Sequence, residues 1–106
     1  MSYEDAITAL ADPTRRVIID RLRSGALPVG AIAKGMTISR PAVSQHLRVL
    51  SDAGLLTVTP VGNRRVYAIA PEGVAGLRAY LDTLWDDALA AFARAAQEKA
   101  KENNNA

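Results

Sequence analysis

The sequence contains no cysteine and a single histidine, His46. Without cysteine there can be no disulfide, no zinc–thiolate site and no thiol catalysis. No apolar run approaches the ~18 residues that a membrane-spanning helix needs. The N-terminal residues Met-Ser-Tyr-Glu-Asp are acidic and lack the hydrophobic segment of a signal peptide. A chain of 106 residues suits one domain, and we expect a soluble cytoplasmic protein.

The groups that catalysis requires are also scarce. Ser44 and His46 are two residues apart, so on a helix their side chains point to different faces. The sequence has no second candidate base, no glycine-rich phosphate loop and no cluster of metal ligands. We therefore expect neither an enzyme nor a bound cofactor or metal.

The net charge of +2 conceals an uneven distribution. Between Pro13 and Arg65 there are nine Lys or Arg residues and two acids, a net charge of +7, whereas the rest of the chain has four basic and nine acidic residues, a net charge of −5. A basic segment between acidic ends indicates a surface that binds a polyanion. We expect Arg21, Arg23 and Lys34 only to solvate helix faces.

The segment from Ser39 to Leu55 has the end signals of one short helix. The Ser39 hydroxyl can accept a hydrogen bond from the free N–H groups of the first turn. Pro41 falls in that turn, where its missing N–H costs nothing. Gly54 stands where a left-handed C-terminal residue is expected.

This helix has two different faces. Val43, Leu47 and Leu50 follow the i, i+4, i+7 spacing of a buried stripe. The other face carries hydroxyl, amide and guanidinium groups without an acid, from Ser44, Gln45 and Arg48, with Arg40 at the start. Such groups match base edges and phosphates in the DNA major groove. On this evidence alone, an ordinary surface helix remains an alternative.

Three shorter helices precede it. Tyr3 to Leu10 has apolar residues at helical spacing. Asp12-Pro13 marks the start of a helix that runs to about Arg23, with Ile18 and Leu22 pointing inward. Pro28 to Lys34 predicts a third helix, and the turn after it leads into the Ser39 helix. The last two helices form a helix-turn-helix.

After Gly54 the apolar period changes from 3.6 to about 2. Leu56 to Pro60 and Val66 to Ile69 are the expected strands of a hairpin, joined by a turn at 61–64. Gly62-Asn63 is a hairpin turn signal, and Arg64 and Arg65 are expected at the exposed tip. A hairpin that follows a recognition helix is a wing.

Pro71-Glu72 begins a last helix that runs to about Lys101, so the domain covers residues 1–101 and residues 102–106 form a disordered tail. Its apolar residues recur at spacings of three and four, as in a coiled coil. A second ridge beside this seam leaves too much apolar surface for a domain of this size. We expect a second copy of the chain to cover it, with a monomer whose helix folds back as the alternative. The expected dimer residues are Tyr3, Ile7, Leu10, Val74, Leu77, Leu81, Leu84, Trp85, Ala88 and Phe92.

The chain is thus predicted to be mainly α with a small β-hairpin, and it resembles the ArsR/SmtB family of bacterial winged helix-turn-helix repressors. The resemblance rests on Ala9-Leu10-Ala11-Asp12-Pro13-Thr14-Arg15-Arg16, Val43-Ser44-Gln45-His46-Leu47-Arg48-Val49-Leu50, Ala53-Gly54-Leu55-Leu56 and Gly62-Asn63-Arg64-Arg65-Val66-Tyr67. It spans about residues 5 to 95. It implies a homodimer that binds a palindromic operator in double-stranded DNA and usually represses transcription.

The expected DNA-binding residues belong to two elements. Those of the recognition helix are Ser39, Arg40, Pro41, Ser44, Gln45, His46 and Arg48, and those of the wing are Asn63, Arg64 and Arg65. The resemblance places His46 at the boundary between the domain and the DNA, with a part-structural role.

The chain departs from the metal sensors of this family, which carry cysteines in the third helix or Asp and His ligands in the last one. Here the third helix reads Val-Gly-Ala-Ile-Ala-Lys, and the last has Asp82, Asp86 and Asp87 but no histidine. Asp82 and Asp86 could share a hard cation across a dimer, although solvated acids are the simpler interpretation. The chain resembles the cysteine-free branch, in which release from DNA depends on another ligand, a partner protein or autoregulation.

A winged helix that binds only proteins is the remaining alternative. Such modules tend to lose the basic recognition face. Arg40, Arg48, Arg64 and Arg65 are all present here, which favours DNA as the partner.

Overall fold

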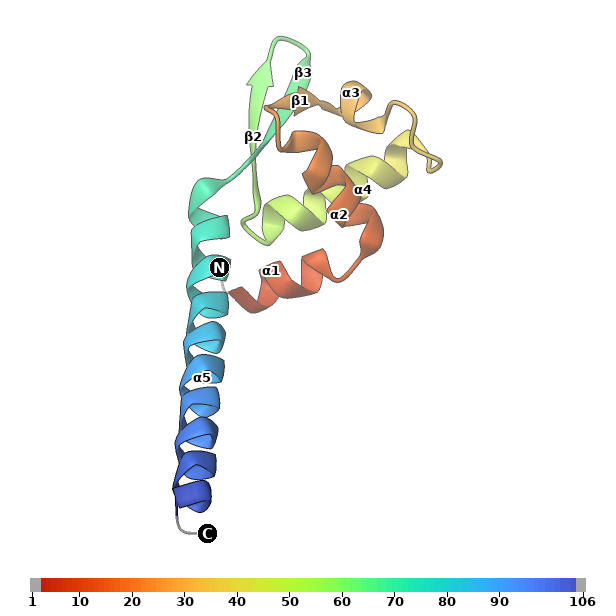
Figure 1. Ribbon diagram of the computed structural model, residues 1–106. Helices are drawn as coiled ribbons and strands as arrows, with labels where there is room; N and C mark the ends of the chain where they lie inside the picture. Colours follow the sequence, from red (N-terminus) through yellow and green to blue (C-terminus); the bar gives the residue numbers. More distant parts are fainter. Residues whose placement is uncertain (1–2, 105–106) are drawn as a thin grey trace.

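The computed structural model describes residues 3–104, and its elements follow the predicted order with one addition (Figure 1). They are α1 (Tyr3–Leu10), α2 (Pro13–Leu22), β1 (Leu27–Pro28), α3 (Val29–Ala33), α4 (Arg40–Asp52), β2 (Leu56–Val61), β3 (Arg64–Ile69) and α5 (Pro71–Asn104). Helices α1 to α4 form a bundle with the hairpin on one side, and α5 projects away from it. The predicted class, mainly α with a winged helix-turn-helix, is confirmed.

The core lies between the four helices α1 to α4 and the base of the hairpin. Ile18 and Leu22 of α2 are buried, as predicted, and Ile32 of α3 joins them. The predicted stripe of α4, formed by Val43, Leu47 and Leu50, is fully buried, with 0 % of each side chain exposed. This stripe fixes the rotation of α4, so its polar face must point outward.

The sheet has three strands in the order β1-β3-β2, all antiparallel. The sequence analysis missed β1, because a strand of two residues shows no alternation. Leu27 pairs with Tyr67 and Pro28 with Val66. Proline is tolerated in an edge strand, and α3 therefore begins at Val29, one residue later than expected.

The turn of the wing is tighter than predicted. Val61 pairs with Arg64 and Pro60 with Arg65, so only Gly62 and Asn63 form the loop. Gly62 has φ +61° and Asn63 has a negative φ, which fits a type II′ turn with glycine in its first central position. Both arginines are exposed, as expected, but they are the first two residues of β3 and do not belong to the turn. Since alternate strand residues point to opposite faces, Arg64 and Arg65 extend to opposite sides of the wing.

Helix α5 gives the molecule its elongated shape. The chain measures 74 × 27 × 22 Å with a radius of gyration of 20.1 Å, against about 13 Å for a compact domain of this size. The helix runs to Asn104, beyond the expected end at Lys101, because no glycine or proline follows Gly76 to stop it. Residues 102–104 are therefore helical, not the disordered tail that was expected; residues 105–106 lie outside the described part.

Helix α5 is anchored to the bundle only through its first turns. The Tyr3 and Tyr80 rings stack with centroids 4.2 Å apart and planes 9° from parallel, which holds α1 against α5. At the junction, the Ala70 N–H donates to the Leu55 carbonyl at 2.8 Å. A Cβ atom on Gly73 would lie 1.8 Å from the Gly54 carbonyl oxygen. The start of α5 therefore crosses the end of α4 at a distance that only glycine permits.

Candidate nucleic-acid interface

The start of α4 is built as the sequence predicted. The Ser39 hydroxyl accepts a hydrogen bond from the Ala42 N–H at 3.3 Å, and Pro41 lies in the first turn. Arg40, Ser44, Gln45 and Arg48 are exposed, because the buried stripe faces the other way. The positive end of the helix dipole and its free N–H groups lie beside Arg40, so this end of α4 favours an anion.

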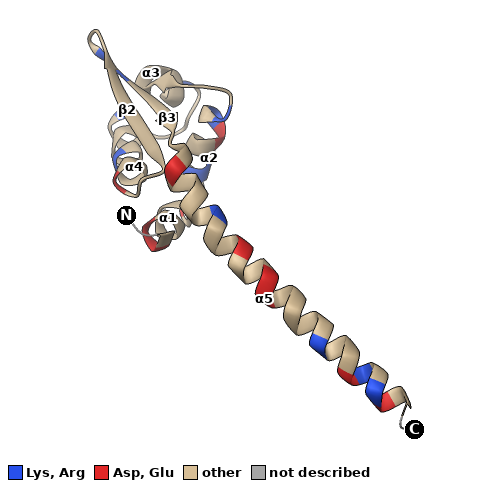
Figure 2. Ribbon diagram, turned by 90° about the vertical axis from the view of Figure 1, so that its left-hand side faces the viewer, with Lys and Arg blue, Asp and Glu red and all other residues tan. Residues whose placement is uncertain are grey.

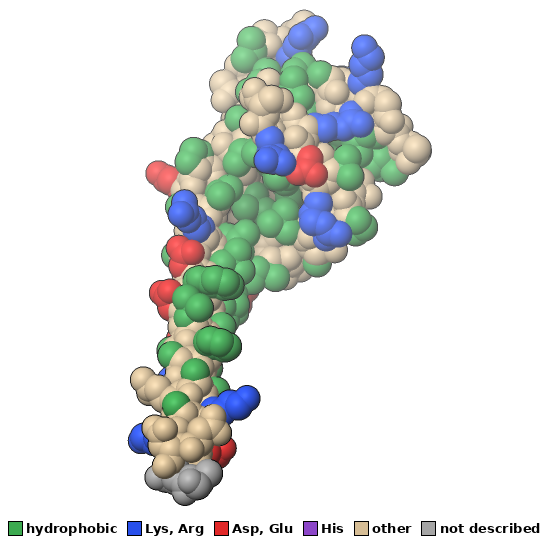
Figure 3. Space-filling view, in the orientation of Figure 1, with side chains coloured by type: hydrophobic (Ala, Val, Ile, Leu, Met, Phe, Trp, Pro, Cys, Tyr) green, Lys and Arg blue, Asp and Glu red, His purple; other side chains and the backbone are tan. Residues whose placement is uncertain are grey.

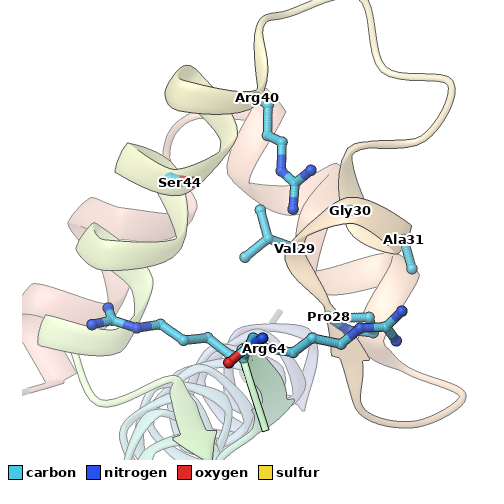
Figure 4. Close-up of a pocket in the computed structure, with 9 residues that line it drawn as sticks. Pro28, Val29, Gly30, Ala31, Arg40, Ser44 and Arg64 are labelled. Carbon is cyan, nitrogen blue, oxygen red and sulfur yellow. The ribbon is translucent and has the colours of Figure 1, made fainter. Parts of the chain in front are cut away.

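A groove of about 590 Å³ separates the start of α4 from the wing (Figure 4). Arg40 reaches from α4 towards Gly30 of α3, and Arg64 lies across the groove on the wing. Three of the lining residues are arginines and none is acidic; the lining is Pro28, Val29, Gly30, Ala31, Arg40, Ser44, Asn63, Arg64 and Arg65. Uncompensated guanidinium groups around an open groove suit a phosphate backbone.

A second groove of about 490 Å³ follows the other side of the wing. Val29, Ser44 and Arg65 line both grooves, so the two grooves adjoin each other. Gln45 and Arg48 of α4 lie in the second groove together with the single acid Asp52. The exposed face of α4 and the wing residues Asn63, Arg64 and Arg65 thus border one surface, called here the α4–wing surface.

Arg48 is only loosely held within this surface. Its Nε atom lies 4.0 Å from Asp52 Oδ2, with side chains that are 85 % and 76 % exposed. Such exposed pairs contribute about 0–1 kcal/mol. Arg48 can therefore leave Asp52 for a stronger acceptor at little cost.

His46 has a different position from its neighbours. It is half-buried, and its Nδ1 atom lies 3.4 Å from Nη1 of Arg15. The Arg15 Nε–H donates to the Ala9 carbonyl at 2.5 Å. Arg15 and His46 therefore connect α1 and α2 to α4.

Three arginines of the basic segment are engaged in holding helix ends. Arg15 and Arg16 bind the last carbonyls of α1; Arg16 Nη1 donates to Leu10 at 2.7 Å and to Ala11 at 3.1 Å. Arg21 donates to the carbonyls of Ile32 and Lys34 at the end of α3, so the expectation that it merely solvates a helix face was wrong. Cations at helix C-termini also interact favourably with the dipole.

Asp12 is the N-cap of α2, as predicted. Its Oδ1 atom accepts from the N–H groups of Thr14 at 2.7 Å and Arg15 at 3.2 Å. Loss of hydration raises the pKa of this carboxyl, but these two hydrogen bonds, followed by the charges of Arg15 and His46, outweigh it and leave the pKa below its usual value.

The remaining cations are distributed in a way that matches the two grooves. Lys and Arg positions, blue in Figure 2, occur on α4 and near the end of the wing, whereas α5 carries both signs. The α4–wing surface therefore contains four arginines of the basic segment, Arg40, Arg48, Arg64 and Arg65.

The expected dimer residues form a separate apolar surface along α1 and α5 (Figure 3). Leu10 and Leu77 are half-buried and the other eight are exposed, most of all Trp85 at 65 % and Phe92 at 74 %. Tyr80, which the sequence analysis did not single out, holds Tyr3 in place. The i, i+3 spacing of Leu77 and Tyr80 on α5 could have indicated it.

Asp82 lies 3.8 Å from the Arg78 guanidinium. Within residues 3–104, no three His, Asp or Glu side chains lie close enough together to hold a metal ion. Among the helices of the same region, none is long and apolar enough to cross a membrane.

Comparisons with known proteins agree with this geometry. A family model described as a helix-turn-helix domain matches residues 10–59. The HTH-type transcriptional regulator Rv2034 of Mycobacterium tuberculosis is 50 % identical over 93 residues, which are 88 % of this chain and 87 % of that protein.

Two solved structures are similar throughout the fold. A possible transcriptional regulator for arsenical resistance has a TM-score of 0.71 and 42 % identity, over 81 % of this chain and 94 % of that one. The homodimeric winged helix-turn-helix domain of Mb0332 from Mycobacterium bovis has a TM-score of 0.64 and 33 % identity, over 79 % and 78 %. The chain belongs to the ArsR family of winged helix-turn-helix transcriptional regulators, which bind DNA and are not enzymes.

Proposed function

We propose that this protein is a homodimeric repressor that reads a palindromic operator through the α4–wing surface and acts in the cytoplasm, where its DNA is found. The observation that supports this most is the composition of that surface. Ser44 and Gln45 are exposed on α4 beside a groove lined by three arginines and no acid. Base readers thus lie next to phosphate ligands.

The two elements of the surface take different parts in binding. Ser44, Gln45 and Arg48 of α4 contact base edges in the major groove, where amides and guanidinium groups make bidentate contacts. Arg40, Arg64 and Arg65 contact phosphates, which position the protein without reading sequence. His46 stays against Arg15 and holds α4 at the correct angle to the bundle.

The dimer determines the form of the operator. Val74 and Leu84 of α5 are exposed, and a homodimer of the related Mb0332 domain is known. Two copies related by a two-fold axis place two α4 helices on one face of the DNA. The operator is then an inverted repeat with half-sites about 34–36 Å apart, one turn of the double helix.

Selection of bound fragments from genomic DNA, followed by affinity measurements on single-base variants, tests this function. Replacing Gln45 with Ala should relax the preference at one base pair of each half-site, by about 1–3 kcal/mol for a bidentate contact. Gln97→Ala makes the same change on distal α5 and should alter nothing. Selection that recovers no preferred sequence would contradict the proposal and favour a module that binds proteins.

A further inference from the structure

A groove at the start of α5 has no part in the function proposed above. It has a volume of about 660 Å³ and lies between the end of α2, the loop that follows it, the end of β3 and the first turns of α5. None of its lining residues lines either groove of the α4–wing surface. We call it the base groove. Its volume is within the range of small-molecule sites, about 300–1,000 Å³.

The walls of the base groove are largely apolar. Leu22 is buried at the end of α2, and Ala68 and Ile69 are half-buried at the end of β3. Four residues of α5 with the spacing i, i+3, i+4 and i+7 complete the lining, so one flank of this helix faces the groove. They are Pro71, Val74, Ala75 and Arg78. Such walls favour a ligand with an apolar body.

The charged side chains of the lining are both cationic. They are Arg23, the C-cap of α2, and Arg78 of α5, and no acid lines the groove. Arg23 Nη1 lies 4.0 Å from Asp20 Oδ1, and Arg78 Nε lies 3.8 Å from Asp82 Oδ2, with all four side chains at least 67 % exposed. Exposed pairs at such distances contribute little. Both guanidinium groups can therefore turn to a ligand carboxylate, which arginine binds through two parallel hydrogen bonds.

The fold itself holds the walls of the groove in place. The Ala70 N–H donates to the Leu55 carbonyl at 2.8 Å, and a Cβ atom on Gly73 would lie 1.8 Å from the Gly54 carbonyl oxygen. The start of α5 is thus fixed against the end of α4. Small-molecule sites are usually formed in this way before the ligand binds.

We propose that the base groove binds an amphiphilic carboxylate, a small molecule with an apolar chain and one carboxylate group. The chain lies against Leu22, Ile69 and Val74, and the carboxylate is held by Arg23 and Arg78. Because the groove shares no residue with the α4–wing surface, the ligand binds to the protein both with and without DNA. This inference goes beyond the proposed repressor function and does not depend on it.

Calorimetric titration of the full-length protein with sodium octanoate tests the chemical class of the ligand. Octanoate should bind, octan-1-ol should bind about tenfold or more weakly because it lacks the charge, and octylammonium should bind no more tightly than the alcohol. From hexanoate to decanoate, all below their micelle concentrations, the affinity should rise by up to about fourfold for each added methylene. Equal affinities for octanoate and octan-1-ol, or an affinity that is independent of chain length, would overturn the proposal.

Substitution of both arginines tests their part in binding. Arg23→Gln/Arg78→Gln removes the two charges from exposed positions, so the fold should be unaffected. This variant should bind octanoate about tenfold or more weakly, with its affinity for octan-1-ol unchanged. Arg94→Gln/Lys99→Gln removes the same charge from distal α5 and should change neither affinity. Equal binding of octanoate by the two double variants would show that the carboxylate does not lie in the base groove.

The α4–wing surface is the rival site for an anion, and the position of the ligand separates the two. In ¹⁵N-resolved NMR spectra, octanoate should shift the amide signals of Ala68, Ile69 and Ala75 and leave those of Ser44 and Gln45 in place. Saturating octanoate should not displace a DNA duplex of random sequence. Displacement of the duplex, or shifts confined to Ser44 and Gln45, would place the anion on the α4–wing surface and reject the inference.

A wild-type protein that does not bind octanoate would also reject it, because the groove would then be closed in solution, as by a second copy of the chain. The titration and the spectra need no DNA. A negative result would therefore leave the proposed repressor function standing.

Discussion

Substitution of Gly73 by alanine tests how closely α5 is joined to the recognition helix. The added Cβ would lie 1.8 Å from the Gly54 carbonyl oxygen and 2.7 Å from the Gly54 carbonyl carbon. Ordinary van der Waals contact begins at 3.4 Å, so α5 must retreat from the end of α4 by about 1.6 Å, the difference between 3.4 and 1.8 Å. Both contacting atoms belong to the backbone and cannot rotate away.

That displacement has an energetic cost at a buried junction. Ala70 and Leu55 are buried, and the hydrogen bond between them at 2.8 Å crosses the same junction. Overpacking of this kind costs about 1–3 kcal/mol, and stretching the Ala70 bond adds to it, because an unsatisfied buried N–H costs about 1–3 kcal/mol. The gain of about 1 kcal/mol from replacing a helical glycine does not offset these terms, so Gly73→Ala should lower stability by about 1–3 kcal/mol.

Gly76→Ala is the matched control in the same helix. A Cβ atom at Gly76 meets nothing within 4 Å, so only the helix propensity changes and stability should rise by about 0.5–1 kcal/mol. Urea and thermal unfolding followed by circular dichroism, at one protein concentration, measure both variants. If Gly73→Ala is as stable as Gly76→Ala, the close approach of α5 to α4 is wrong.

Three further predictions concern the caps and the dimer. Because the pKa of Asp12 is lowered in the folded protein, its carboxylate contributes stability above the unfolded pKa, and this contribution is lost as the pH falls through the lower folded pKa. In urea unfolding from pH 7 to 3, Asp12→Asn should therefore lose less stability on acidification than the wild type. Equal losses in the two proteins would refute this. Ser39→Ala removes the acceptor of the Ala42 N–H and should lower the free energy of unfolding by about 0.5–2 kcal/mol; no change would mean that the cap does not contribute. Leu84→Asp should dissociate or unfold the dimer by burying an unpaired charge, whereas Thr83→Asp on the outer side should not; sedimentation at micromolar concentration measures this, and a monomeric wild type would contradict it.

The end signals of the helices were the most predictive part of the sequence. Ser39 and Asp12 form the caps expected of them, and Gly54 ends α4 with φ +81°. These signals act within one turn, so neighbouring residues suffice to show them. The stripe at Val43, Leu47 and Leu50 adds the rotation of α4 and therefore which side chains face outward.

The features that the sequence did not predict depend on contacts between segments that are distant in the chain. The β1 strand exists only because Leu27 and Pro28 meet β3. The roles of Arg15, Arg16 and Arg21 depend on carbonyls at helix ends some five to thirteen residues away. A count of charges in the sequence does not distinguish these arginines from Arg40, although their side chains are hydrogen-bonded to carbonyls in the folded protein.

The position of the wing arginines illustrates the same limit on a smaller scale. Because β3 begins two residues earlier than expected, Arg64 and Arg65 lie in the strand, and their side chains point to opposite sides of the wing. Local turn signals identified Gly62-Asn63 but not the register of the pairing. Whether each arginine contacts a phosphate stays a prediction.

The central claim, that the α4–wing surface binds DNA, is tested most directly by the salt dependence of DNA binding when Arg64 and Arg65 are both replaced with alanine. Each phosphate contact contributes about 0.9 to the slope of log affinity against log salt concentration, and a dimer has two wings. The double variant should bind operator and random DNA more weakly and with a slope that is flatter by about 2 to 4 units. Arg94→Ala/Lys99→Ala removes the same charge from distal α5 and should leave the slope unchanged. If the wing variant instead binds random DNA as tightly as the wild type, with the same slope, the wing does not contact DNA.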